Sequence, residues 1–239
     1  MLRHPSWLVV GLTSVALFLV ADRAFSQTPI PPNRVAMWKK VEEAIQKGLP
    51  KTALKELQPI IESALNDKAF PEAIKAIGKR IALNSQIEGD LPDTRISLMK
   101  AELATAPKEM RPALNAILGS WYWGYFKQNR LQFGNRTATA APPSDDFKTW
   151  DLPRLFAEIE KHYLLALEDE DALKKISVAS YEPLLEKGTL PDSYRPTLFD
   201  FLVFIAIDFY ASGEQAGARP EDTFEIDAAS AALGSTEDF

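Results

Sequence analysis

The 239-residue chain contains no cysteine and only two histidines, His4 and His162. The lack of cysteine excludes a disulfide framework, a thiol nucleophile, an iron–sulfur cluster and a cysteine-based zinc site. One histidine after residue 26 is too few for a histidine-rich metal site. His162 stands between Lys161 and Tyr163 in an amphipathic pattern, so we predict that it is a partly exposed surface or boundary residue. An enzyme built on His162 and nearby acidic groups is the least favoured function class.

The chain also lacks the short motifs of common catalytic and nucleotide sites. It has no Gly-x-Gly-x-x-Gly, no phosphate loop ending in Gly-Lys-Ser/Thr and no Gly-x-Ser-x-Gly. The acidic groups at 145–146 and 168–171 lack the spacing and the glycine of a calcium loop, so we predict solvated turns. Glu158 and Glu160 fall on different faces of a helix, which disfavours a glycosidase pair. We therefore expect no catalytic activity, no cofactor and no bound metal.

Basic residues are not in excess. The chain has 27 Lys and Arg against 33 Asp and Glu, which gives a formal net charge of −6. Nucleic-acid binding needs a concentrated basic face that neutralises phosphates. We therefore expect no nucleic-acid partner.

Long hydrophobic runs are absent except at the start of the chain. Arg3 and His4 precede an apolar run over 8–21, and the small residues Ala24 and Ser26 follow it. This pattern is typical of a secretory signal peptide, residues 1–26, cleaved after Ser26. The run has about 14 residues, fewer than the roughly 20 that cross a bilayer, although an uncleaved anchor is the alternative. We expect a periplasmic or extracellular protein with no stable membrane span after cleavage, or one retained at the inner membrane if the signal is uncleaved.

The rest of the chain is dominated by helical periodicity. Residues 27–33, QTPIPPN, form a predicted proline-rich spacer, and 34–212 a predicted helical-hairpin domain. The first and third predicted helices start about 34 residues apart, which is the period of tetratricopeptide repeats. We predict an all-α fold of stacked α-hairpins in a degenerate tetratricopeptide-like array. The predicted buried stripes are Val35, Trp38, Val41 and Ile45; Leu54, Leu57, Ile61 and Leu65; Phe70, Ile74, Ile77 and Ile81; and Ile96, Met99 and Leu103.

The predicted helix over 110–131 carries Leu-Gly-Ser-Trp-Tyr, which fits the Leu-Gly-x-x-Tyr part of the tetratricopeptide signature. Asn115 stands where that signature has Trp, and Asn135 where it has an aromatic residue, so the repeats are degenerate. Gly119 would let a neighbouring helix approach closely. The segment 137–143, TATAAPP, is a predicted exposed loop.

Two further helices are predicted after this loop. Asp151 is the expected N-cap of a helix whose stripe continues to 167. The stretch 197–211 is the most apolar after residue 26, and we predict a helix buried on most sides. The remainder, 213–239, is an acidic tail in which 227–233 has the composition of one more short helix.

A cluster of aromatic and basic residues is the candidate interaction site. Trp121, Trp123 and Tyr125 crowd one helix, and Arg130 and Arg136 follow. Such residues can stack on single-stranded bases or on another ligand. Alternatively, the aromatic residues fill the space between stacked hairpins while the polar ones bond to carbonyls. The acidic balance of the chain favours this packing interpretation.

The same segments carry a family resemblance. Residues 120–139, SWYWGYFKQNRLQFGNRTAT, 145–167, DDFKTWDLPRLFAEIEKHYLLAL, and 194–210, YRPTLFDFLVFIAIDFY, resemble the N-terminal helical region of large exported bacterial proteins of the alpha-2-macroglobulin family. The turn 47–55, KGLPKTALK, is similar to that region too. The resemblance spans about 35–233 and rests on ordered blocks of sequence rather than on a catalytic motif.

The resemblance implies an exported protein of protease trapping or surface defence, a form of endopeptidase inhibition. Many members of the family are built from β-sandwich macroglobulin domains and carry an internal Cys-to-Gln thioester. This chain has no cysteine and no β-rich segment, so neither feature is present and no functional residue can be transferred. Our hypothesis is a non-catalytic helical interaction or spacer module, the front part of such a protein, whose partners are its other domains or a periplasmic protein. The alternative is a stand-alone exported scaffold that binds a protein or peptide.

Overall fold

The computed structural model describes residues 30–89, 92–134, 146–185 and 191–214, and within these residues it is all-helical with no β-strand. The predicted all-α class is therefore confirmed. Four short 3-10 turns, η1 to η4, cover Lys108–Met110, Phe147–Thr149, Val178–Tyr181 and Asp192–Tyr194. The α-helices are α1 Pro32–Gln46, α2 Pro50–Asn66, α3 Phe70–Ile87, α4 Pro92–Thr105, α5 Arg111–Gly134, α6 Leu152–Leu167, α7 Glu170–Leu173 and α8 Leu198–Tyr210.

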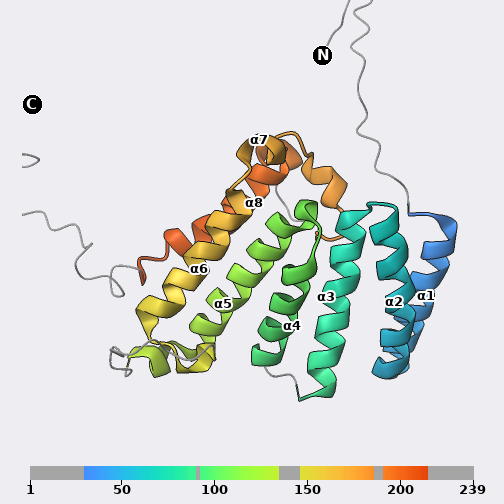
Figure 1. The fold of residues 1–239 in the computed structure, drawn as a ribbon, viewed down its shortest axis with the longest axis horizontal. Coiled ribbons are helices and arrows are strands. Elements are labelled where there is room, and N and C mark those ends of the chain that lie inside the picture. Colours follow the sequence, from blue (N-terminus) through green and yellow to red (C-terminus); the bar gives the residue numbers. More distant parts are fainter. Residues whose placement is uncertain (1–29, 90–91, 135–145, 186–190, 215–239) are drawn as a thin grey trace, which may run out of the picture.

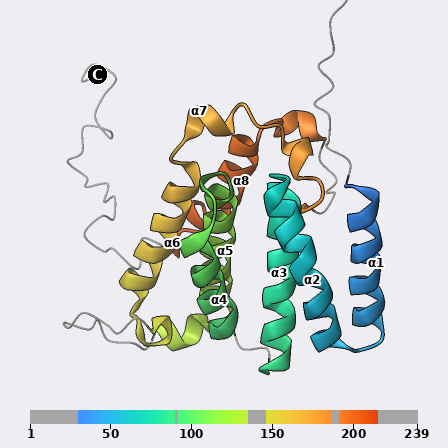
Figure 2. The same cartoon turned by 45° about the vertical axis from the view of Figure 1, so that its right-hand side comes forward.

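Helices α1 to α6 stand side by side in chain order, each packed against the next, as stacked helical hairpins (Figure 1). After α6 the chain crosses the upper ends of the helices, as seen in Figure 1, through α7, and η3 contacts α3. Helix α8 then packs against α5 and α6, at the end of the array opposite α1 (Figure 2). The predicted stacked hairpins are confirmed, while the finer tetratricopeptide likeness stays a prediction.

The helix ends follow local sequence signals. Asp151 caps α6 as predicted, because its carboxylate accepts a hydrogen bond of 3.0 Å from the backbone N–H of Arg154. Gly48 ends the first hairpin turn with φ +66°, a conformation that glycine adopts without strain. The predicted spacer is shorter than expected, since α1 begins at Pro32. Proline is tolerated in the first turn of a helix, where the missing N–H has no intrahelical partner.

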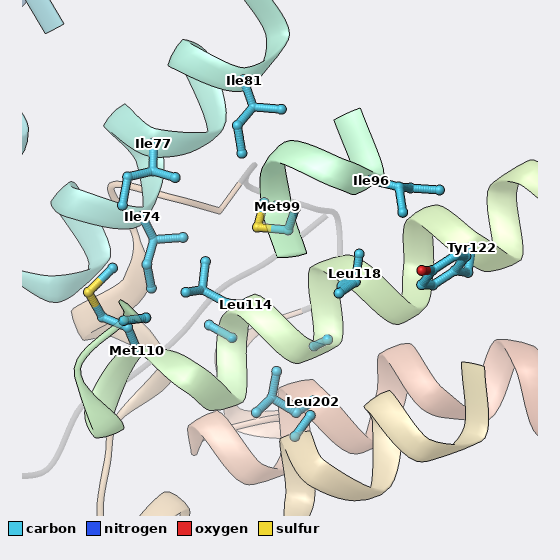
Figure 3. Packing of buried hydrophobic residues seen from close by; sticks show 14 of the residues in the cluster. Ile74, Ile77, Ile81, Ile96, Met99, Met110, Leu114, Leu118, Tyr122 and Leu202 are labelled. Atoms are coloured by element: carbon cyan, nitrogen blue, oxygen red, sulfur yellow. The ribbon is translucent and has the colours of Figure 1, made fainter. Parts of the chain in front are cut away.

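The core is one continuous cluster that runs through the array (Figure 3). Leu114 and Leu118 of α5 lie at its centre and are fully buried. Ile74 and Ile81 of α3 face them from one side and Leu202 of α8 from the other (Figure 3). The predicted stripes of α2, α3 and α4 supply the expected residues to this core, as buried or partly buried side chains.

The predicted stripe of α1 is wrong at its first position. Val35 is 54% exposed, and Arg34 is 1% exposed in its place. The Arg34 side chain lies between α1, α2 and α3, where its Nε donates to Glu72 Oε2 at 3.0 Å and its guanidinium also pairs with Asp67. Trp38 Nε1 donates to the other Glu72 oxygen at 2.8 Å. An ion pair therefore replaces the expected hydrophobic contact and joins the first three helices.

Gly119 allows the close approach of α6 to α5, as the sequence suggests. A Cβ at this position would lie 3.1 to 3.3 Å from the ring of Tyr163, which is itself buried. Gly124 on the same helix has no heavy atom within 4 Å of such a Cβ. The two glycines therefore differ in the space around them.

The Gly119→Ala variant is expected to have a free energy of unfolding about 1 to 3 kcal/mol lower than that of the Gly124→Ala variant, because only the first substitution forces the Tyr163 ring to move. Gly124→Ala should raise the free energy of unfolding by about 0.5 to 1 kcal/mol, since alanine loses less backbone entropy in a helix. Urea unfolding of both variants tests this. Equal stability of the two variants would contradict the close packing.

The predicted burial of α8 on most sides is wrong for one face. Leu202 and Phe209 are buried against α5 and α6, but Phe204, Ile207 and Tyr210 are 50%, 49% and 42% exposed. The cause is the position of α8 at the end of the array, where one face packs on α5 and α6 and the opposite face is half-exposed, with the Arg195 guanidinium 4.6 Å from the Phe204 ring centroid.

Several predictions lie outside the described residues: the signal peptide 1–26, most of the spacer, the loop 137–143, Asn135, Asp145 and the tail from 215. Within the part that is described, no helix has both the length and the hydropathy to cross a membrane.

Candidate functional site

The structure divides the predicted aromatic and basic cluster between two sides of α5. Trp121 and Tyr125 are half-buried and line a groove against α4, which we call the α4–α5 groove. Trp123 and Arg130 line a groove against α8, which we call the α5–α8 groove. Residues at 121 and 123 fall on different sides because successive helical residues are about 100° apart. Arg136 lies outside the described residues.

The α5–α8 groove has a volume of about 590 Å³. Phe204 and Ile207 form one wall from α8, and Trp123 and Phe126 of α5 form the floor. Because Phe204 and Ile207 are half-exposed, the groove presents apolar surface to solvent. Such a surface favours an apolar ligand or protein segment over a charged substrate.

Charged groups at the rim of this groove are paired with one another. Asp208 Oδ2 accepts two hydrogen bonds, one from Trp123 Nε1 at 2.9 Å and one from Lys127 Nζ at 3.3 Å. These hydrogen bonds lower the pKa of Asp208 below its usual value, and the bond from the Trp123 indole has the larger effect. Arg130 pairs with Glu214 at 2.6 Å rather than with a loop carbonyl. The rim therefore has little net charge, and the apolar wall is the distinctive feature of the groove.

Trp123 belongs to the core as well as to the groove. Its ring is 5% exposed, stacks on Phe126 at a centroid distance of 5.2 Å and meets the edges of Phe156 and Phe209. The indole N–H reaches Asp208 at the surface. The floor of the groove is thus fixed by packing from three helices.

The α4–α5 groove is smaller, about 260 Å³, and more polar. Trp121 and Tyr125 provide aromatic surface, and Ser120 and Gln128 provide hydrogen-bonding groups. The nearby Asn129 lies at a non-helical position in α5, φ −114° and ψ 18°, and its side chain bonds to the carbonyl of Tyr125 at 2.9 Å. The side-chain N–H of Asn129 is therefore used within the helix.

His162 is buried, contrary to the prediction of a partly exposed residue. Its ring is 4% exposed in total and stacks near Tyr122 at a centroid distance of 5.9 Å. Nδ1 lies 2.8 Å from Asn115 Oδ1, and the amide group of Asn115 donates to the Arg111 carbonyl at 3.0 Å. Asn115 Oδ1 thus accepts, so Nδ1 is the donor in this contact. Asn115 therefore holds the histidine in place.

The second ring nitrogen of His162 faces an acidic group. Nε2 lies 3.4 Å from Glu158 Oε1, while Lys161 Nζ contacts both oxygens of Glu158 at 3.1 and 3.2 Å. Together, His162, which has the largest effect, and Lys161 lower the pKa of Glu158 from 4.5 to about 2. Burial of the carboxylate acts in the opposite direction. The Glu158 side chain is 7% exposed, so solvent screens these contacts little.

This pKa shift makes stability depend on pH. The ionised Glu158 stabilises the fold above pH 4.5, and that stabilisation is lost as the pH falls toward about 2. At 1.36 kcal/mol per pKa unit, Glu158→Gln should cost up to about 3 kcal/mol near neutral pH and much less near pH 2. Urea unfolding of both proteins from pH 7 to pH 2 tests this. A cost that stays constant with pH would contradict the account.

A third hollow, the α4–α6 pocket, opens next to His162 with a volume of about 300 Å³. Leu118 and Trp150 belong to its walls. The polar groups in contact with His162 are the side chains of Asn115 and Glu158, neither of which is a hydroxyl or thiol nucleophile. The described residues also contain no group of three or more His, Asp or Glu side chains placed to hold a metal ion.

Comparisons of the chain with family models, characterised proteins and solved structures find no match. The resemblance to the helical region of alpha-2-macroglobulin-family proteins therefore stays a prediction that rests on the segments quoted above.

Proposed function

We propose that this protein is a non-catalytic helical interaction module and that the α5–α8 groove is its docking surface. The observation that carries the proposal is the exposed apolar face of α8, with Phe204 and Ile207 each about half-exposed. Terminal helices of stacked arrays need a polar outer face to stay soluble alone, so an apolar one indicates a covering element.

The geometry of the groove limits the kind of partner. Its floor is fixed by the packed ring of Trp123, and its wall presents Phe204 and Ile207 one helical turn apart. Apolar side chains spaced along a helix or strand would fit such a wall. The paired charges of Lys127 and Asp208 at the rim suit a partner whose flanking groups are polar and mixed in sign.

The family resemblance supports a specific setting for this module. It suggests the N-terminal part of an exported alpha-2-macroglobulin-like protein, in which the partner is another domain of the same chain or a periplasmic protein. The sequence of residues 1–26 supports export. Chemistry that traps a protease would then be supplied elsewhere, because this chain has no cysteine for a thioester.

A stand-alone exported scaffold is the second candidate. The α4–α5 groove favours it, because Trp121 and Tyr125 offer aromatic surface beside the hydrogen-bonding Gln128. Such a groove suits an extended peptide, as in repeat scaffolds that bind segments along their helices.

Substitution of the groove wall tests the leading proposal. The double variant Phe204→Ser/Ile207→Ser is compared with Leu164→Ser/Leu165→Ser, which changes two other exposed apolar residues, 60% and 40% exposed, on α6. Both full-length proteins are immobilised and exposed to the exported fraction of the source cells. We expect the groove variant to lose at least about tenfold of the specific partner retained by the wild type, while the control keeps it.

Two results would contradict the docking proposal: equal retention by both variants, or no partner on the wild type. The family setting is tested separately by sequencing the DNA that follows the Phe239 codon. Macroglobulin-like coding sequence in any frame supports the alpha-2-macroglobulin setting, and its absence favours the stand-alone scaffold.

A further inference from the structure

The α4–α6 pocket gathers positive charge in a chain whose net charge is −6. Lys100 lines it from α4, and Arg154 and Lys161 line it from α6. Residues 154, 158 and 161 are four and then three positions apart, so they share one face of α6. Glu158 is the acidic group among the lining residues, so Lys100, Arg154 and Lys161 leave a local excess of two positive charges without counting His162.

Two of these cations have no carboxylate partner among the residues that the structure describes. Lys161 is paired with Glu158 at 3.1 Å, but neither Lys100 nor the Arg154 guanidinium takes part in a described ion pair. The guanidinium instead lies over the Trp150 ring, 5.0 Å from its centroid. Such stacking fixes the plane of the guanidinium and leaves its N–H edge free to bind an oxyanion in two places.

An unsatisfied buried group points to the same pocket. In the described part of the chain, the Tyr122 hydroxyl is buried without a hydrogen bond, whereas His162 Nε2 has Glu158 Oε1 3.4 Å away. His162 lines the pocket, and the Tyr122 ring packs between His162 and Trp150, at centroid distances of 5.9 and 6.0 Å. Buried polar atoms are normally satisfied, so the Tyr122 hydroxyl, whose ring packs against two lining residues of the pocket, indicates a missing polar partner there.

We propose that the α4–α6 pocket binds a small multivalent oxyanion, held by Lys100 and Arg154. Phosphate and carboxylate groups share the chemistry that this pair recognises, since both accept charge-assisted hydrogen bonds from lysine and arginine. A volume of about 300 Å³ admits a small molecule but not a folded partner. The pocket is separate from the α5–α8 groove, so this ligand site goes beyond the proposed docking function and does not depend on it.

The test measures binding of inorganic phosphate and of citrate to the full chain by calorimetry at low salt. We expect saturable binding with one site, and a loss of about tenfold in affinity for each of Lys100→Gln and Arg154→Gln, the loss of one charge-assisted contact. Lys127→Gln is the control, since Lys127 is an exposed cation of the α5–α8 groove. It should bind as the wild type does. Tighter binding of phosphate than citrate identifies a phosphorylated ligand, and the reverse order a polycarboxylate.

A second readout locates the ligand without relying on affinity. The imidazole ¹⁵N signals of His162 should shift as the anion is added to the wild type and stay unchanged in the Lys100→Gln/Arg154→Gln variant. Lys100 and Arg154 are exposed, so these variants should keep the fold, which their unfolding curves check. The proposal is overturned if neither anion binds, if Lys127→Gln loses as much affinity as Arg154→Gln, or if the His162 signals do not move.

Discussion

Glu72→Ala is expected to lower the free energy of unfolding by about 3 to 5 kcal/mol, because it leaves the Arg34 guanidinium buried without its main partner. Arg34 and Glu72 are 1% and 3% exposed, and they join α1 to α3. The loss also frees Trp38 Nε1, which donates to Glu72 at 2.8 Å. Urea unfolding of the variant measures the cost. Partial separation of α1 from α3 would appear as faster amide exchange in α1.

Glu42→Ala is the matched control, since Glu42 pairs with Lys79 at 3.0 Å with its own side chain 48% exposed. Exposed pairs contribute about 0 to 1 kcal/mol, so this change should be small. The double substitution Arg34→Met/Glu72→Met should recover much of the stability, because a hydrophobic replacement removes both buried charges. A cost for Glu72→Ala as small as for Glu42→Ala would show that Arg34 is solvated in the protein.

Trp123→Ala is expected to cost about 3 to 5 kcal/mol, the usual range for removing a large buried aromatic ring. The ring contacts Phe126, Phe156 and Phe209 from three helices, so the surrounding structure cannot collapse easily into the cavity. The substitution also removes the hydrogen bond to Asp208. Thermal and urea unfolding give the cost.

Trp121→Ala provides the comparison for this prediction, because Trp121 lies two positions away on α5 and is only half-buried. Its cost should be clearly smaller, since less area is removed from water on folding. If Trp123→Ala is nearly neutral while partner binding is lost, the ring serves a ligand and not the core, and the packing interpretation fails.

Regular features of the fold could be predicted from the sequence because they depend on local patterns. Helical periodicity located α2, α3 and α4, and an Asp followed by a Pro in the first turn located the start of α6 at Asp151. Gly119 indicated close helix packing because only glycine leaves room there for the Tyr163 ring. These signals act within one or two turns and need no knowledge of distant residues.

Features that depend on distant partners could not be predicted. Arg34 is buried because Glu72, 38 positions away, and Asp67 meet it. Burial of His162 likewise depends on Asn115, 47 positions away. A single arginine or histidine on an amphipathic pattern shows nothing of such a partner, and polar residues of these kinds are usually exposed.

The residues of the candidate site could be predicted from the sequence, but their arrangement in space could not. Periodicity could have shown that Trp121 and Trp123 lie on different faces of α5, because they are two positions apart. The groove itself depends on α8, which packs on α5 and brings Asp208 to Trp123, 85 positions away in the chain. Its exposed wall was missed because an apolar helix is normally buried, and only the position of α8 at the end of the array leaves Phe204 and Ile207 in solvent.

Site-specific photo-crosslinking tests the central claim most directly. A photoreactive amino acid replaces Ile207 in the wall of the α5–α8 groove, or Leu164 on α6 as the control, in the full-length chain expressed in the source cells. The account predicts a crosslink from position 207 to one defined protein or domain, and none from 164. It also predicts that Phe204→Ser weakens that crosslink. Equal crosslinking at both positions, or none at 207, would contradict the assignment of this groove as the docking surface.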